Sequence, residues 1–265
     1  MTQYRLELAY VGTPFHGWQS QPSGNSIQDH LEKCLGVFLR EDVTVIGSSR
    51  TDSGVHAEQQ VATFRSKADF NTHRLLKGVN AMLPNEVSVQ AIQAVDPNFH
   101  PILSATAKLY RYRIWTHPVP SPFLREFSWH VHNLNDDLLR RAAQDFIGEH
   151  NFKSFCATDS SAKTFVRRVL DIHFESHPRC LEIYVLGEGF LKQMVRNMVG
   201  TLVEIGLGKL PADAIPAIVG AQDRKAAGRT APAAGLSLVK VFYDQPPEKV
   251  DLGFLCEESL GFRLI

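Results

Sequence analysis

The densest group of side chains able to do chemistry lies between residues 50 and 56. It combines a base, a carboxylate and a hydroxyl in a polar turn, in the order Arg50, Thr51, Asp52, Ser53, Gly54, Val55 and His56. A carboxylate has an ordinary pKa of about 3.9, so at neutral pH it is ready to attack an electrophile or to accept a proton. The alternative is a structural turn, in which Asp52 bonds nearby backbone amides and Gly54 supplies an unusual dihedral angle.

Histidines suggest two further kinds of chemistry, and each lacks a necessary partner. His56 lies close to Asp52, which suggests a hydrolase, yet no activated nucleophile accompanies the pair. His130 and His132 in Trp-His-Val-His suggest metal ligands, but two histidines on one strand face lack the third and fourth ligands of a zinc site. We therefore assign His130 and His132 to structure and predict no metal.

The cysteines indicate neither a zinc knuckle nor a disulfide framework. Four are present and widely separated, with no C-x-x-C pair, at Cys34, Cys156, Cys180 and Cys256. Both kinds of site need cysteines at closer, paired spacings. We expect free thiols.

Periodic apolar residues predict the elements that must hold the polar turn. Strands and helices alternate through the first hundred residues, as in a mixed α/β layer. Ser26 is a suitable N-cap, and Asp29 favours the positive end of the helix that follows. The predicted strands are residues 4–10, 43–46, 60–64 and 87–95, and the predicted helices are residues 27–38 and 72–83. The polar turn from Gly47 to Gly54 therefore lies between two strands.

The second half repeats this order without visible sequence identity. Asn135 caps a helix that Gly148 is placed to end. The predicted strands are residues 110–115, 170–174, 181–185 and 236–243, and the predicted helices are residues 136–146, 190–202 and 212–219. Two similar units facing one another would form a central cleft, which is a favoured place for a site.

Length and composition set the broad class. A chain of 265 residues with 44% hydrophobic content can bury a substantial core, and it fits two domains of modest size. The start of the chain lacks a charged segment followed by a continuous apolar stretch, and no window approaches the roughly 18 apolar residues of a membrane span. We expect a cytoplasmic protein with no membrane partner.

The charge balance bears on nucleic-acid binding. The chain has 28 basic and 28 acidic residues, whereas domains that bind nucleic acid are often distinctly basic. Residues 244–265 hold five of the acids and two of the bases, so that 26 basic and 23 acidic residues remain elsewhere. A segregated surface can still present a basic groove to phosphates.

Five motifs, in order along the chain, point to a known family. They are Tyr10-x-Gly12 with Phe15-x-Gly17-Trp18-Gln19-x-Gln21-Pro22; Gly47-Ser-Ser-Arg50-Thr51-Asp52-Ser-Gly54-Val55-His56-Ala57; Phe99-His100 with Ser104-Ala105-x-Ala107-Lys108-x-Tyr110-x-Tyr112; Phe190-Leu191-x-x-Met194-Val195-Arg196-Asn197-Met198-Val199-Gly200; and Thr230-Ala231-Pro232-x-x-Gly235-Leu236. Over roughly residues 4 to 243 the sequence resembles the TruA family of tRNA pseudouridine synthases. It departs at Ser49, where the family usually has glycine before the arginine.

The resemblance implies a role for four of these residues. Asp52 would be the catalytic carboxylate, and Arg196 would pair with it to hold it ionised and oriented. Tyr110 would stack on the target base and assist proton transfer. Arg50 would fill the gap left when the target nucleotide leaves the helix, because a stacked and paired uracil cannot be rotated in place. The structural alternatives are a core tyrosine and a solvated arginine.

Further basic residues are candidates for contacts with RNA. Lys108, Arg167 and Arg168 are predicted to bind substrate, and Lys163, Arg111 and Arg113 could also hold phosphates. Such charges are usually just solvated faces of a protein. We keep both interpretations.

The family also implies the overall picture. It is an α/β (α+β) fold of two similar domains, each a mixed, mostly antiparallel sheet with helices on one side, facing across a central active-site cleft. We place the domains at residues 1–103 and 104–243, followed by an acidic tail at 244–265. The implied reaction needs no metal and no cofactor, and the implied partners are tRNA, modified at uridines 38, 39 and 40 of the anticodon stem and loop, and a second copy of the chain in a homodimer.

Two other classes of function remain as alternatives. One is a non-catalytic RNA-binding or folding protein that uses the same groove. The other is a metal-dependent hydrolase built on Asp52 and the histidines. Retention of Asp52, Tyr110 and Arg196 favours the synthase over the first, and the lack of a ligand cluster counts against the second.

Overall fold

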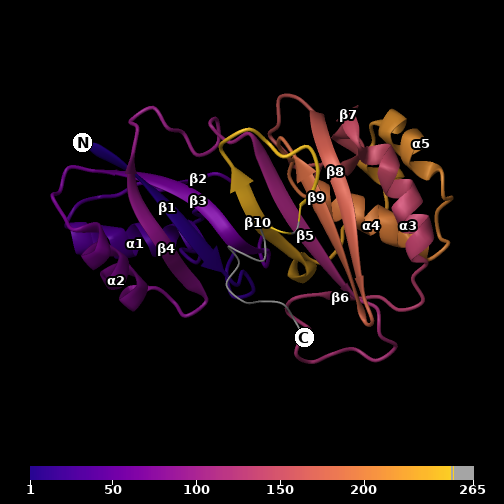
Figure 1. Cartoon of the computed structure of the whole chain (residues 1–265), viewed down its shortest axis with the longest axis horizontal. Helices are drawn as coiled ribbons and strands as arrows, with labels where there is room; N and C mark the ends of the chain where they lie inside the picture. Colours follow the sequence, from indigo (N-terminus) through magenta and orange to yellow (C-terminus); the bar gives the residue numbers. More distant parts are fainter. Residues whose placement is uncertain (252, 254–265) are drawn as a thin grey trace.

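One mixed sheet of ten strands forms the centre of the protein in a computed structural model that describes residues 1–251 and residue 253 (Figure 1). The strands are β1 (Thr2–Tyr10), β2 (Ile46–Gly47), β3 (His56–Ser66), β4 (Val87–Val95), β5 (Ala107–Trp115), β6 (Trp129–His130), β7 (Gly148–Asn151), β8 (Val166–His177), β9 (Cys180–Gly187) and β10 (Leu236–Phe242). The sheet has the order β4-β1-β3-β10-β5-β9-β8-β7, and the short strands β2 and β6 pair with β3 and β5. Within the described residues, β10 with β3 and β5 with β6 are the parallel pairs, and the other pairs are antiparallel.

The helices of the described residues differ in whether a side chain caps their first turn. They are α1 (Ile27–Leu39), α2 (Thr72–Met82), α3 (Asp136–Ala143), α4 (Met194–Gly206) and α5 (Ala214–Ala221), with short 3₁₀ turns η1 (Gln144–Phe146), η2 (Phe152–Phe155), η3 (Arg224–Ala226) and η4 (Ala233–Gly235). Ser26 and Asp29 form a capping box on α1, which satisfies free backbone amides at the start of that helix. The side chains of Asn71 and Asn135 each accept one hydrogen bond from a backbone amide in the first turn of α2 and α3, respectively.

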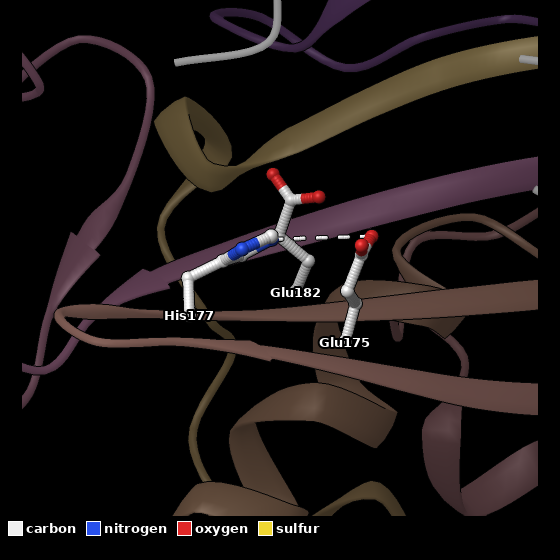
Figure 2. A group of neighbouring side chains, drawn as sticks. All are labelled: Glu175, His177 and Glu182. Atoms are coloured by element: carbon white, nitrogen blue, oxygen red, sulfur yellow. Dashed lines mark ion pairs between the residues drawn. The ribbon is translucent and has the colours of Figure 1, made fainter. Parts of the chain in front are cut away.

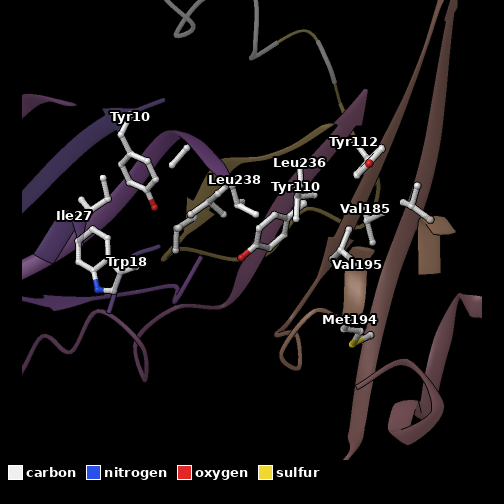
Figure 3. Close-up of a cluster of buried hydrophobic side chains, with 14 of the residues drawn as sticks. Tyr10, Trp18, Ile27, Tyr110, Tyr112, Val185, Met194, Val195, Leu236 and Leu238 are labelled. Atoms are coloured by element: carbon white, nitrogen blue, oxygen red, sulfur yellow. The ribbon is translucent and has the colours of Figure 1, made fainter. Parts of the chain in front are cut away.

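Alternation along the strands separates two apolar clusters. Tyr110, Tyr112 and Ile114 of β5 pack in the main core with residues of the helices, and Figure 3 shows part of this core. Leu109 and Tyr184 face the other way and belong to a smaller cluster of strand residues. Successive residues of a strand point to opposite faces of the sheet. The described helices pack only with the first set of strand residues, so they cover one face of the sheet.

Strand β10 joins the two halves of the chain. It pairs with β3 of the first half on one side and with β5 of the second half on the other. Helices α1 and α2 lie over the first half, and α3, α4 and α5 lie at the other end of the molecule (Figure 1). The mixed, mostly antiparallel α/β fold expected from the sequence is therefore confirmed, and the two half-sheets are continuous. The domain boundary at residue 103 stays a prediction.

The structure corrects two predicted elements. Residues 43–45 are not a strand, because the backbone amide of Val45 donates to Glu32 at 2.9 Å and its carbonyl accepts from Gln28 at 3.1 Å. Side chains of α1 thus take the place of a neighbouring strand. The helix predicted from Phe190 begins four residues later, because Gln193 adopts a left-handed φ of 60° immediately before Met194.

Two predictions concern the end of the chain and the membrane. Part of the predicted acidic tail, residues 252 and 254–265, lies outside the described residues. Among the residues that the structure does describe, every helix is too short or too polar to cross a membrane.

Candidate active site

A loop of residues 48–55 connects β2 to β3 and carries Asp52. The backbone amide of Val55 donates to the carbonyl of Asp52 at 3.1 Å, and Gly54 has a φ of 77° that favours glycine. The backbone is thus the turn that the structural alternative predicts. The side chain of Asp52 does not bond the turn, however: its Oδ2 accepts a hydrogen bond from Arg196 Nη1 at 2.8 Å.

The ion pair between Asp52 and Arg196 joins the two halves of the protein. The side chains are 20% and 14% exposed, respectively, so Arg196 is not a freely solvated arginine. Arg196 Nε also donates to the carbonyl of Ala231 at 2.8 Å. Two directional hydrogen bonds therefore fix the plane of the guanidinium group, and the guanidinium in turn orients the carboxylate.

Buried side chains hold the loop on its other side. Gln60 forms two hydrogen bonds with the backbone of Ser49: its Nε2 donates to the carbonyl at 2.7 Å, and its Oε1 accepts from the amide at 3.2 Å. The hydroxyls of Tyr10 and Thr51 lie 2.8 Å apart in a hydrogen bond. Ser49 itself is not in the left-handed region, so a side chain causes no backbone strain where the family usually has glycine.

Two glycines of the first motif let another segment approach the loop closely. A Cβ atom on Gly12 would lie 2.0 Å from the carbonyl oxygen of Val55. Gly17 has a φ of 87°, and a Cβ atom there would lie 2.7 Å from the carbonyl oxygen of Thr51. Gly12 and Gly17 therefore allow this segment to pack closely against the loop, a role that the sequence alone did not reveal.

Tyr110 lies beside this ion pair on β5. Its ring packs in the main core and meets Phe190 edge-on, with 5.2 Å between ring centroids, as the core alternative requires. Burial raises the pKa of Tyr110 to about 12, and the negative charge of Asp52 adds to the shift. Figure 3 shows the hydroxyl directed toward the side of Tyr10 and Trp18. The phenol stays protonated at neutral pH and can donate a hydrogen bond.

Lys108 is the next inward residue on the same strand. Its Nζ donates to the carbonyl of Ser48 at 2.7 Å, at the start of the loop, and burial lowers the pKa of Lys108 to about 8. Arg50 is exposed at the edge of the loop. The structure thus brings Asp52, Arg196, Tyr110, Lys108 and Arg50 to one place.

Arg167 and Arg168 lie elsewhere, on β8, which is separated from β5 by β9. The guanidinium of Arg167 donates to the carbonyl of Val166 at 2.6 Å, and that of Arg168 lies 3.9 Å from Glu188. Arg168 is exposed. Neither arginine contacts the loop of Asp52, so any RNA contact they make is at a distance from it.

Both ring nitrogens of His56 form hydrogen bonds with backbone groups. Its Nδ1 accepts from the amide of Gly12 at 3.1 Å, and its Nε2 lies 2.8 Å from the carbonyl of Glu126 and 3.1 Å from that of Ala234. Burial lowers the pKa of His56, which favours the neutral ring. A ring with both nitrogens engaged is a poor general base, which weakens the hydrolase alternative.

Among the described residues, the histidine and carboxylate groups away from this loop do not form a suitable metal site. His130 Nε2 bonds the carbonyl of His117 at 2.8 Å. Figure 2 shows Glu175, His177 and Glu182, whose ligand atoms lie within 4.8 Å of one another. Glu182 already accepts from Arg113 at 2.6 Å and from Tyr184 at 2.7 Å. A cation there would meet a guanidinium group, so the cluster does not revive the metal-dependent hydrolase.

Comparison with known proteins gives sequence matches over most of the chain. The sequence profile of the family described as tRNA pseudouridine synthase matches residues 8–102 and 142–244, which is more than half of the chain. A protein named tRNA pseudouridine synthase A from Acetivibrio thermocellus is 43% identical over 92% of this chain and 100% of its own length. The protein of that name from Bacillus subtilis is 39% identical over 91% of this chain and 98% of its own length.

A solved structure described as a Cbf5-Nop10-Gar1 complex contains a chain that is 14% identical, with a TM-score of 0.38, over 89% of this chain and 48% of that one. The family assignment depends on the sequence matches instead, which confirm the resemblance found in the five motifs. This chain belongs to the tRNA pseudouridine synthase family, whose members are isomerases.

Proposed function

We propose that this protein isomerises uridine to pseudouridine at positions 38, 39 and 40, in the anticodon stem and loop of tRNA. Relatives named tRNA pseudouridine synthase A support tRNA as the substrate. The single observation that supports the site is the ion pair between Asp52 and Arg196, which places an oriented, partly exposed carboxylate between the two halves of the protein.

The proposed reaction breaks the bond from uracil N1 to ribose C1′, turns the base and forms a bond from C5 to C1′. C5 loses its proton and N1 gains one, so no atom is gained or lost overall. Asp52 begins the reaction, by attack on the sugar, by attack on the base or by removal of a sugar proton. All three routes need an ionised carboxylate that is oriented toward the nucleotide.

The neighbouring residues have complementary roles in this proposal. Arg196 orients Asp52, since its Nη1 donates a hydrogen bond to the carboxylate. Tyr110 offers a ring to the detached base and a protonated hydroxyl that can donate to it. Arg50, exposed at the edge of the loop, enters the helix where the target nucleotide leaves it.

The proposal extends to the wider setting of the enzyme. By resemblance to its family, the protein acts in the cytoplasm as a homodimer, and each tRNA is gripped by both subunits. Lys108 stands as a substrate-binding residue, although its hydrogen bond to Ser48 also gives it a role in shaping the loop. A non-catalytic RNA-binding protein is the remaining alternative, and turnover distinguishes the two.

The deciding experiment treats tRNA transcripts with the purified protein and maps pseudouridine by carbodiimide-dependent reverse-transcription stops. We expect stops at positions 38, 39 and 40 wherever these are uridines. A transcript with cytidine at all three positions is the control and should show no new stop. Binding of tRNA without any stop would favour the non-catalytic alternative.

A further inference from the structure

The segment from η3 to η4 is tied to helix α4 by the side chain of Arg224. The Nη1 atom of Arg224 donates to the carbonyls of Ala227 at 3.3 Å and Gly228 at 2.9 Å. Its Nη2 donates to Asn197 Oδ1 and Thr230 Oγ1, both at 2.9 Å. Four hydrogen bonds thus direct this guanidinium inward, into the protein's own backbone and side chains.

Asn197, which accepts one of these bonds, lies within α4, next to Arg196 in the sequence. Its side chain is completely buried, and its Oδ1 also accepts from Thr230 Oγ1 at 2.7 Å. Its Nδ2 donates to the carbonyl of Phe155 at 2.7 Å. A buried amide with all these partners fixes the position of whatever bonds to it, because leaving any of them unpaired is costly.

The same segment also contacts the side chain and backbone of Arg196. Its Nε donates to the carbonyl of Ala231 at 2.8 Å, and the amide of Ala231 donates back to the carbonyl of Arg196 at 3.1 Å. The contact is close: a Cβ atom on Gly200 would lie 1.8 Å from the carbonyl oxygen of Arg229. The position of the Ala231 carbonyl, and with it the plane of the Arg196 guanidinium, therefore depends on how the segment is fixed at its start.

We propose that Arg224 is a positioning residue for the reaction. It fixes residues 227–231 against α4, so that the carbonyl of Ala231 holds Arg196 in the plane that orients Asp52. The inference rests on the proposed role of the Asp52–Arg196 pair. Arg224 does not contact RNA in this account, because both of its terminal nitrogens, Nη1 and Nη2, already donate to groups within the protein.

The test compares Arg224→Met with Lys225→Met. Lys225 is exposed in the same 3₁₀ turn, so its substitution removes an equal charge from the same turn. We expect Arg224→Met to lower kcat roughly tenfold to a hundredfold, as misplacement of a catalytic group does, with KM for tRNA changed less than about twofold. Lys225→Met should keep the wild-type kcat. A raised KM with an unchanged kcat would instead make Arg224 a phosphate contact and overturn the proposal.

A double-mutant cycle tests whether Arg224 acts through Arg196. Lysine has no Nε donor for the Ala231 carbonyl, so in an Arg196→Lys protein the further change Arg224→Met should lower kcat less than about twofold. The same loss in both backgrounds would show that Arg224 acts independently, which contradicts the inference.

Thr230→Val provides a second route if Arg224→Met fails to fold. It removes one hydroxyl between Arg224 and Asn197 at nearly constant shape, and we expect a several-fold loss of kcat with KM unchanged. An unchanged kcat in Thr230→Val would count against the network. An inactive wild-type protein would refute the proposed function itself, whereas an active wild type, an inactive Asp52→Asn and a fully active Arg224→Met would refute this inference alone.

Discussion

Two groups of carboxylates and guanidiniums lie on the same sheet and differ in how fully they are paired. On the helix-covered side, Asp52 has one partner among the described residues, Arg196, and its side chain is 20% exposed. On the other side, Glu182 is 8% exposed and is held by Arg113 at 2.6 Å and Arg111 at 3.6 Å. The second oxygen of Glu182 accepts a hydrogen bond from the Tyr184 hydroxyl, and Arg111 also forms an ion pair with Glu58.

The comparison separates charges that can react from charges that hold the protein together. A carboxylate surrounded by donors has little accepting capacity left for a substrate, and removing it leaves a buried guanidinium without compensation. A carboxylate that has one orienting partner and is partly exposed remains charged and can still contact a substrate. Asp52 should therefore matter for turnover and Glu182 for stability.

The largest expected effect is on turnover of Asp52→Asn. Losing the charged oxygen should lower kcat by on the order of a thousandfold or more, while the affinity for tRNA and the unfolding midpoint stay near wild type. Single-turnover assays, filter binding and thermal melting measure the three quantities. Turnover near wild type would remove Asp52 from the mechanism.

Next in size is the loss of stability in Glu182→Gln. Breaking a buried ion pair from one side should lower the free energy of unfolding by about 3 kcal/mol, with kcat nearly unchanged below the new melting temperature. Urea unfolding measures the change. A variant as stable as wild type would show that the network on this face contributes no net stability.

The same variant changes the response to acid. Burial alone would raise the pKa of Glu182, but Arg111 and Arg113 reverse this and lower it. A lowered carboxylate pKa contributes stability above the ordinary value of 4.5, and that stability is lost as pH falls through the folded-state pKa. Unfolding curves of Glu182→Gln should therefore depend less on pH below about 4.5 than those of wild type.

Arg50→Ala sharpens the comparison on the reactive side. Arg50 is exposed and has the proposed task of stabilising the flipped nucleotide, so its loss should lower kcat roughly tenfold while leaving the Kd for tRNA within about twofold. Both constants should be measured across a salt series. Weaker binding with full turnover at saturating tRNA would show that the flipping role is wrong.

The smallest effect is expected for Arg168→Ala, far from the reactive loop. If Arg168 contacts a phosphate, the slope of log affinity against log salt should become shallower by about 0.7 to 0.9, with kcat unchanged. Arg50→Ala, measured in parallel, should leave that slope closer to wild type. An unaltered slope would make Arg168 a solvated residue.

Much of the fold follows from local patterns. Alternation predicts β4 with its bounds as observed, and Ser26 with Asp29 predicts the start of α1. Of the strand predicted at residues 43–46, only Ile46 lies in a strand, because Gln28 and Glu32 satisfy the backbone of Val45, and apolar periodicity carries no information about such side-chain bonds. The position of β10 between two distant strands is likewise a tertiary contact that periodicity cannot express.

The site was less accessible to sequence reasoning than the fold. Spacing alone left Asp52 as a turn residue or a carboxylate for chemistry, and left Arg196 as a solvated arginine or its partner. A separation of 144 residues made their ion pair visible only through resemblance or structure. Gln60 and Arg224 were missed because Gln60 bonds the loop and Arg224 bonds the segment that contacts Arg196, and no spacing or composition marks such a role.

The place of β10 has a consequence for the order in which the protein matures during synthesis. Both β3 and β5 leave the ribosome long before Leu236–Phe242, the strand that lies between them. Until then each exposes an unpaired edge, which invites pairing with other chains. A nascent chain that stops before residue 236 should therefore aggregate, and the contact between α4 and the loop of Asp52 should be completed only when the sheet closes. Activity would then be withheld until β10 has been synthesised.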